Sequence, residues 1–385
     1  MTAPSVRHPG EFRWETRLLA VVTLVLTVFG VANCYGTGTY LATWHEEASQ
    51  QLVGALFGGV IFLGAAYTDY HIWRRLARPL FYVTLASLAI MAAAELLWPN
   101  SRAPSIVGSI VPRLNGARRW IRLGGIMIQV SEIARFTLIV FIALKAVSLG
   151  NRIRDFRKGF IPLAAPVIVT AALVAAEPNL SMGVLLWFAG AMVIFTGGAR
   201  IPHLILMSLS GAACAVIMIQ LTAFRSDRLD SMSGSAQECV PTEQVCESLI
   251  GYGSGGVTGV GFGEGTQKLG HVPYGYSDFI LSVIAEEWGL IGVTFTALCF
   301  AMFCWMGFRI AKTAGDPFGT LLAGGLTTMV GVAAFLHAAV VTRMIPATGL
   351  TLPFMSAGRV SLVMYLFSAG VIVSIGRRRG RPSRR

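Results

Sequence analysis

Asp278 lies where a polar segment gives way to a long apolar run, in the stretch GYSDFILSVIAEEWGLIG at residues 275–292. A carboxylate at this boundary could stabilise the start of a helix by interacting with the helix macrodipole. It could also act as a general base that takes a proton from a hydroxyl arriving along a membrane surface, which requires direct reach. Asp278 is therefore the first candidate for a catalytic residue.

Four further ionisable residues lie inside apolar segments. Glu132 and Arg135 are three residues apart in IQVSEIARF, so they can pair on one face of a helix. Ionisable residues at membrane depth are functional candidates, and an ion pair that only packs helices together explains these two equally well. Glu286 and Glu287 lie more than one helical turn beyond Asp278, and we favour interhelical hydrogen bonding as their role.

Arginines crowd one loop, between the third and fourth apolar segments. Guanidinium groups match phosphate oxygens in pairs, so this loop could bind an anion such as a lipid-linked pyrophosphate. A solvated loop that contacts lipid headgroups is the alternative. The five arginines are Arg102, Arg113, Arg118, Arg119 and Arg122.

The segment 225–277 is rich in Gly, Ser and polar residues, and loops of this length are usually functional or disordered. Cys239 and Cys246 lie within it and could form a disulfide in an oxidising compartment; two free thiols are the alternative. The letters GYGSGG at 251–256 have the spacing of a dinucleotide-binding motif, but no strand precedes them. We interpret these glycines as sites of close backbone packing.

The elements that must position these residues are membrane helices. The chain has 385 residues, of which 54% are hydrophobic and 13% charged, with a mean hydropathy of +0.65. This is the composition of an integral membrane protein, and no nucleic-acid motif accompanies the basic excess. Runs of about 17 to 25 apolar residues predict an all-α fold of ten spans. The predicted spans are residues 17–35, 52–70, 79–97, 128–148, 161–177, 182–198, 202–224, 278–311, 318–341 and 351–376.

Two of these spans need comment. The first is long enough to stay in the bilayer as an anchor, so we do not expect a cleaved signal peptide. The eighth is too long for one untilted span, so we expect it to tilt or to project from the hydrocarbon.

The positions of Lys and Arg orient the spans. If both termini lie inside, most of the 31 basic residues fall in cytoplasmic segments, as the positive-inside rule requires. We therefore expect a multi-pass protein of the cytoplasmic (inner) membrane with both termini cytoplasmic. Residues 1–16 form the N-terminal tail, residues 17–376 the membrane domain with a large extracytoplasmic loop at 225–277, and residues 377–385 a basic tail.

Four segments, taken together and in order, resemble the SEDS family of cell-wall polymerases (shape, elongation, division and sporulation). The segment GEGTQKLG at 263–270 looks more similar to the FtsW and SpoVE branch than to the RodA branch. The four segments are NGARRWIRLGGIMIQVSEIARF (115–136), EPNLSMG (177–183), SLIGYGSGGVTGVGFGEGTQKLGHVPYGYSDFILSVIAEEWGLIG (248–292) and IPATGLTLPFMS (345–356).

The resemblance implies a peptidoglycan glycosyltransferase of cell division that polymerises lipid II at the outer face of the membrane, with inversion at the anomeric carbon. It implies that Asp278 is the catalytic residue. It also implies partners, namely a class B penicillin-binding protein transpeptidase and other divisome proteins, in addition to membrane lipids. The candidates for binding lipid II and its pyrophosphate are Arg119, Trp120, Arg122, Gln267 and Lys268.

No cofactor is certain; a divalent cation such as Mg²⁺ could assist, although the sequence shows no cluster of metal ligands. Two alternative functions stay open: a flippase for a lipid-linked precursor, with Glu132, Arg135 and Glu286 as a polar path, and a catalytically impaired divisome scaffold. The second is suggested by departures from the residues that are usual in the family. These departures are Val130, Asn179, Ser181, His337, Arg343 and Arg359.

Overall fold

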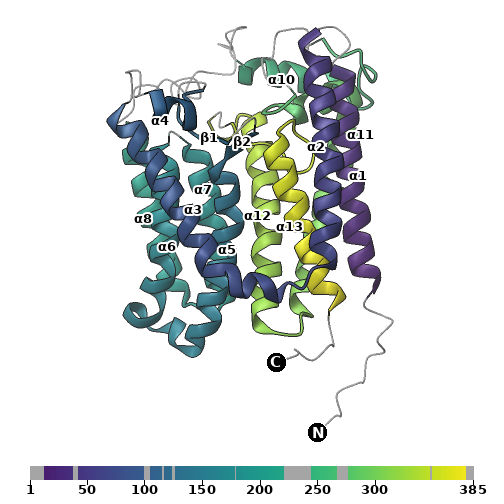
Figure 1. Ribbon diagram of the computed structural model, residues 1–385. Coiled ribbons are helices and arrows are strands. Elements are labelled where there is room, and N and C mark those ends of the chain that lie inside the picture. The colour runs from purple at the N-terminus through teal and green to yellow at the C-terminus, as the bar shows by residue number, and fades with distance from the viewer. Residues whose placement is uncertain are drawn as a thin grey trace.

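The computed structural model of the protein describes residues 13–37, 42–98, 105–114, 117–123, 126–177, 179–220, 244–266, 276–346 and 349–378. Most of them are helical, and the long helices stand side by side (Figure 1). The helices are α1 (Arg13–Thr37), α2 (Ala42–Tyr67), α3 (His71–Leu97), α4 (Ser105–Ile110), α5 (Val130–Leu149), η1 (Gly150–Arg154), η2 (Phe156–Phe160), α6 (Ile161–Ala176), α7 (Leu180–Thr196), α8 (Ile201–Gln220), α10 (Gln244–Gly255), α11 (Ile280–Lys312), α12 (Pro317–Val341) and α13 (Arg359–Arg377). Strands β1 (Trp120–Leu123) and β2 (Ile126–Gln129) form an antiparallel pair.

Within the described ranges, eight helices are long and apolar enough to cross a membrane, so the protein is a multi-pass membrane protein. Two shorter apolar helices, Leu180–Thr196 and Ile201–Ala212, occupy the sixth and seventh predicted segments. The prediction of a mostly helical membrane fold is therefore confirmed, and the count of ten spans stays a prediction. The helices α4 and α10 and the β1–β2 hairpin were not predicted, because they are short and lie in segments without a long apolar run.

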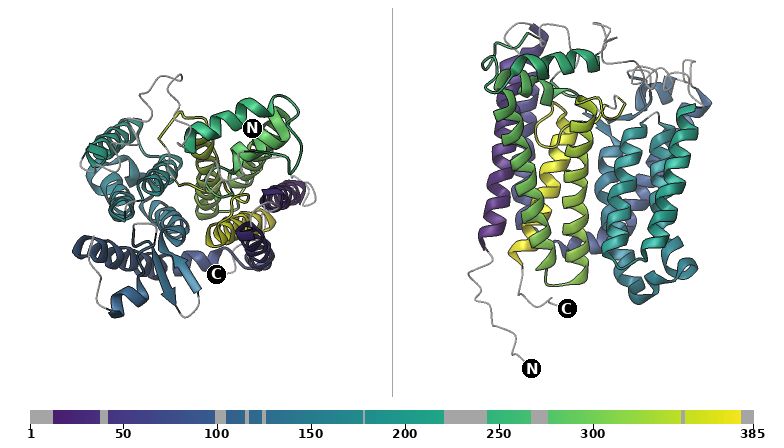
Figure 2. Two further views of the ribbon diagram at one scale, coloured as in Figure 1. Left: turned by 90° about the horizontal axis from the view of Figure 1, so that it is seen from above. Right: turned by 180° about the vertical axis from the view of Figure 1, so that it is seen from behind.

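The helices form two groups that α12 joins. Seen from above, α1, α2, α11 and α13 lie on one side and α3, α6, α7 and α8 on the other (Figure 2). Helix α12 contacts α5 and α7 as well as α11 and α13. Helix α13 packs along α2, and Gly370 allows the close approach, since a Cβ there would lie 2.5 Å from the carbonyl oxygen of Phe62.

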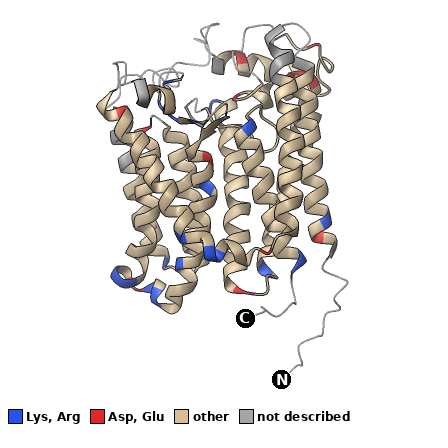
Figure 3. Ribbon diagram, viewed as in Figure 1, with Lys and Arg blue, Asp and Glu red and all other residues tan. Residues whose placement is uncertain are grey.

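One end of the bundle collects basic side chains, and we call it the basic end (Figure 3). Arg309 near the end of α11 binds the buried Glu15 near the start of α1 with an Nε–Oε1 distance of 2.8 Å. Gly376 near the end of α13 packs against Thr16. The start of α1 and the ends of α11 and α13 therefore lie at the same end, and α4, β1, β2 and α10 lie at the opposite end (Figure 1).

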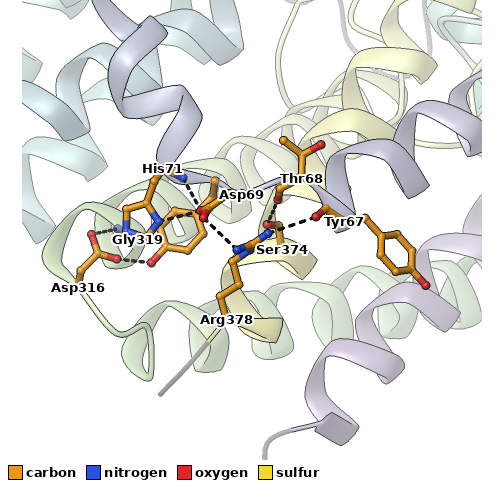
Figure 4. Close-up of polar contacts among 9 residues, drawn as sticks. Tyr67, Thr68, Asp69, His71, Asp316, Gly319, Ser374 and Arg378 are labelled. Carbon is orange, nitrogen blue, oxygen red and sulfur yellow. Dashed lines mark hydrogen bonds and ion pairs between the residues drawn. The ribbon is translucent and has the colours of Figure 1, made fainter. Parts of the chain in front are cut away.

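A polar cluster closes the basic end (Figure 4). Arg378 donates to Asp69 Oδ2 at 2.9 Å, and His71 Nδ1 lies 2.8 Å from Asp69 Oδ1. Partial burial opposes ionisation of Asp69, but the hydrogen bonds from His71 and the charge of Arg378 hold its pKa below the usual value. Asp316 caps the start of α12 and accepts a hydrogen bond from the hydroxyl of Tyr70. The cluster ties the α2–α3 turn to the α11–α12 turn and to the end of α13.

Helix α11 is broken at Gly289, a feature that the prediction of one long eighth span did not include. Gly289 has φ +61° and ψ −157°, a conformation that is essentially restricted to glycine. The segment that follows α10 fills the break: Val260 N donates to Glu286 O at 2.9 Å and Gly261 N to Glu287 O at 3.2 Å. The periodicity of apolar residues does not report such a break, because both halves of the helix are apolar.

Replacing Gly289 by Ala is expected to destabilise the protein by about 1–3 kcal/mol or more, because Ala cannot adopt this backbone conformation without strain. The added Cβ would also lie 2.6 Å from the carbonyl carbon of Val257. Gly64→Ala in α2 is the matched control, since a Cβ there meets nothing within 4 Å. Thermal unfolding in detergent should show a lower melting temperature for Gly289→Ala only; equal temperatures for the two variants would contradict the assignment.

Candidate functional site

Asp278 lies in a turn at residues 276–279, directly before α11 and at the end of the bundle opposite the basic end. The residue is half-buried, and Ser277 Oγ donates to its Oδ1 at 3.3 Å. The backbone of Gly349 lies against the other carboxylate oxygen, since a Cβ at Gly349 would be 3.4 Å from Oδ2. The carboxylate therefore lies between the start of α11 and the segment at residues 349–358.

The segment 349–358 fixes this turn through hydrogen bonds. Ala357 N donates to Tyr276 O at 2.9 Å, and Ser356 Oγ donates to Ser277 O at 2.6 Å. Ser356 Oγ in turn accepts from Leu352 N at 2.7 Å. The family-like stretch IPATGLTLPFMS thus positions the backbone that carries Asp278, and this gives that stretch a physical role.

Gln51 of α2 holds the same segment and was missed by the sequence analysis. Its side chain is 1% exposed; Nε2 donates to Ser356 O at 2.8 Å and Oε1 accepts from Gly358 N at 3.3 Å. A signal was available, because Gln51 is a polar residue at the edge of an apolar run in QQLVGALF. Buried amides of this kind are almost always hydrogen-bonded, and here the partners are backbone groups beside the site.

The arginines of the loop between α3 and α5 divide into two sets. Arg118 is buried, with Nη1 donating to Val111 O at 2.8 Å and its backbone N donating to Glu95 Oε2 at 3.2 Å. Arg113 lies 3.6 Å from the same carboxylate of Glu95. These two cations are therefore used to build the loop, whereas Arg102 lies outside the described residues.

Arg119, Trp120 and Arg122 lie on or beside the β1–β2 hairpin. Arg119 immediately precedes β1 and is half-buried, and its Nε donates to the backbone carbonyl of Glu177 at 3.0 Å. Trp120 and Arg122 alternate along β1, so they point to the same face of the hairpin, and Arg122 is exposed. Arg119 is therefore held against the α6–α7 turn, whereas the side chain of Arg122 is exposed.

Glu177 in the α6–α7 turn is fully buried, and within the described ranges neither carboxylate oxygen has a hydrogen-bond partner. Burial raises its pKa to about 8, although the nearby charge of Arg119 acts in the other direction. Glu177 belongs to the family-like stretch EPNLSMG, and its local sequence predicts no particular role for it. Its burial depends on how three segments pack, which no local pattern reports.

Three residues that differ from those usual in the family have a local explanation. Asn179 caps α7, with Oδ1 accepting from Met182 N at 3.4 Å, and Asn and Asp cap helices about equally well. Arg343 has φ +59°, which explains why glycine is usual there. His337 is buried, with Nδ1 lying 2.8 Å from Leu350 O, so it supports the segment beside Asp278.

Arg359 is the first residue of α13 and is exposed, so it lies at the rim of that span. Arg135 is different, because it is fully buried. It forms an ion pair with Glu132, donates to the hydroxyl of Tyr365, and its Nη2 donates to Ser361 Oγ at 3.2 Å. These contacts join α5 to α13 inside the bundle.

Glu286 and Glu287 are both buried on the part of α11 that precedes the break. Glu286 Oε1 accepts from Thr266 N at 2.7 Å and from Thr266 Oγ1 at 2.9 Å. A partner of Glu286 is therefore the segment after α10, where we had expected a neighbouring membrane helix.

Three predicted residues, Cys239, Gln267 and Lys268, lie outside the described residues. Cys246 is buried and disulfide-bonded, and its pairing with Cys239 stays a prediction. In the described ranges, no group of three or more His, Cys, Asp or Glu side chains could hold a metal ion.

A family model and individual relatives in the sequence comparisons indicate the same family. The model of the family of FtsW, RodA and SpoVE, described as "Cell cycle protein", matches residues 14–380. The chain is 32% identical over 372 residues to the "Probable peptidoglycan glycosyltransferase FtsW" of Geobacter sulfurreducens, covering 95% of this chain and 96% of the relative. It is 31% identical over 366 residues to "Stage V sporulation protein E" of Bacillus subtilis, covering 94% and 96%.

Two solved structures share the fold. One is RodA of Thermus thermophilus, with a TM-score of 0.68, 21% identity, and coverage of 94% of this chain and 98% of that one. The other comes from a peptidoglycan synthase complex, with a TM-score of 0.74, 22% identity and the same coverage. Because the family model matches residues 14–380 and the two relatives named above are more than 30% identical to the chain, the chain belongs to the FtsW/RodA/SpoVE family of cell cycle proteins.

Proposed function

We propose that the protein is a peptidoglycan glycosyltransferase of cell division that polymerises lipid II at the outer face of the cytoplasmic membrane. Its similarity over almost the whole chain to relatives named as peptidoglycan glycosyltransferases carries this proposal. The position of Asp278 supports it, because the turn that carries the carboxylate is fixed by the segment 349–358, which Gln51 of α2 holds in turn, at the end of the bundle opposite the basic end. We further propose ten spans, with both termini and the basic end in the cytoplasm.

In the proposed reaction, Asp278 acts as the general base. It takes the proton from the 4-hydroxyl of the acceptor N-acetylglucosamine, whose oxygen forms a bond to the anomeric carbon of the donor. The bond from that carbon to the lipid pyrophosphate breaks from the opposite face, so the configuration inverts. Charge grows on the departing pyrophosphate, and cations already fixed nearby lower the barrier.

Arg119 and Arg122 are the proposed cations for the pyrophosphate, together with Lys268. Trp120 and Gln267 complete the proposed binding set. Arg119 is supported best, because its hydrogen bond to the carbonyl of Glu177 fixes the guanidinium while the buried carboxyl group beside it is uncharged near neutral pH. An uncharged neighbour does not compete with an anion for the guanidinium of Arg119.

This arrangement predicts that the affinity for lipid II falls as the pH rises through about 8. Below that pH Glu177 is protonated; above it the carboxylate ionises and competes with pyrophosphate for Arg119. The KM for lipid II should therefore rise between pH 7 and 9 in the wild type. In Glu177→Gln the side chain cannot ionise, so this part of the pH dependence should vanish, and an unchanged pH profile in that variant contradicts the coupling.

The direct test of the function is to reconstitute the purified protein in liposomes with labelled lipid II. Glycan chains are expected. Label that only changes leaflet would favour the flippase, and no change of either kind would favour the scaffold.

We also propose a class B penicillin-binding protein transpeptidase as the partner, since a similar fold occurs in a peptidoglycan synthase complex.

A further inference from the structure

An apolar groove of about 600 Å³ lies between α1 and α11. One wall consists of residues on α1 between Leu24 and Ala32, and the other of Phe262, Trp288 and Phe295. Its volume is in the range of ligand sites, about 300–1,000 Å³. Among the described residues the lining is apolar and uncharged, so the groove suits a hydrocarbon chain.

The break in α11 builds this groove. The two backbone hydrogen bonds from Val260 and Gly261 to α11 hold the next residue, Phe262, with its ring centroid 5.8 Å from that of Trp288. Phe29 packs edge-on against Trp288 at 5.5 Å and against Phe295 at 5.4 Å. The aromatic wall is therefore held by backbone contacts and is not a chance array of side chains facing lipid.

Buried residues of α1 connect one end of the groove to the candidate site. Trp288 Nε1 donates to Asn33 Oδ1 at 3.1 Å, just beyond the last groove residue of α1. The thiol of the next residue, Cys34, contacts Tyr276 O and Met355 O at 3.9 Å, and Tyr276 begins the turn that carries Asp278. From this rim the groove runs along α1 for about 12 Å toward the middle of the span.

We propose that the groove binds the isoprenoid chain of the lipid-linked substrate whose head group reaches Asp278. This inference rests on the proposed function. Position favours the substrate chain over a phospholipid acyl chain, because the contacts of Asn33 and Cys34 join the end of the groove to the turn that carries Asp278. A chain held here also keeps the sugar at the membrane surface within reach of Asp278.

The test combines a variant that fills the groove with substrates whose isoprenoid chains differ in length. Val28→Trp places a bulky side chain in the groove. Val83→Trp on α3 is the matched control, because Val83 is exposed to a similar extent: 66% of its surface is exposed, compared with 58% for Val28. Each variant polymerises lipid II that carries either an undecaprenyl or a geranylgeranyl chain. We expect Val28→Trp to raise the KM for the undecaprenyl substrate by about tenfold and to leave the short-chain substrate and the control unaffected. Equal effects on both substrates, or none, overturn the proposal.

A second measurement does not depend on activity. A photoreactive benzoylphenylalanine in place of Leu24 should crosslink to undecaprenyl lipid II, and excess undecaprenyl pyrophosphate should prevent this while excess phosphatidylglycerol should not. Crosslinks to phospholipid that undecaprenyl pyrophosphate does not reduce overturn the proposal. Absence of glycan synthesis by the wild type would count against the proposed function alone, because crosslinking reports the groove independently.

Discussion

Replacing Asp278 by Asn is expected to lower the rate of lipid II polymerisation by about 10²–10⁴-fold, the range typical for loss of a general base. The amide keeps the size of the side chain and can still accept from Ser277, but it cannot take the proton from the attacking hydroxyl. The hydrogen bonds that fix the turn involve the backbone of Tyr276 and Ser277, so they do not depend on the carboxylate. The fold should therefore survive the substitution.

The measurement is the rate of glycan synthesis by purified protein at saturating lipid II, with a melting curve for each variant. Asp155→Asn is the matched control, since Asp155 is an exposed carboxylate that caps η2 and Asn can also cap. Wild-type rates for Asp278→Asn would remove the proposed base. A lower rate together with a lower melting temperature would instead assign the loss to folding.

The helices and Asp278 could be predicted from the sequence because their signals are local. A long continuous apolar run predicts a helix in a bilayer, since a helix satisfies all of its backbone groups within the segment itself. Asp278 is visible as an acid at the edge of such a run. Its position before α11 follows directly from that boundary.

The residues that hold the site could not be predicted in the same way, because their roles depend on contacts between distant segments. Gln51 and Ser356 are 305 residues apart, and neither has a neighbour in sequence that reveals the hydrogen bond between them. The raised pKa of Glu177 results from burial in a turn packed against the β1–β2 hairpin. The break at Gly289 depends on a segment that precedes α11 in the chain.

The buried pair of Glu132 and Arg135 leads to the second large effect. Arg135 is 1% exposed, and its partners lie on two helices: Glu132 on α5, and Tyr365 and Ser361 on α13. Ser361 Oγ also lies 2.8 Å from Thr351 Oγ1, in the segment that fixes the Asp278 turn. The pair is therefore part of the packing that supports the site, which favours the structural interpretation over a path for transport.

Arg135→Met is expected to destabilise the protein by about 3–5 kcal/mol, because it leaves the carboxylate of Glu132 buried without its counter-charge. The double variant Glu132→Gln, Arg135→Met removes both charges, so it should be more stable than the single variant although Tyr365 and Ser361 still lose a donor. Unfolding in mixed micelles measures both, and loss of glycan synthesis should follow the loss of stability. If the double variant is no more stable than Arg135→Met, the uncompensated charge is not the cause. The importance of Arg135 would then lie in its hydrogen bonds to α13.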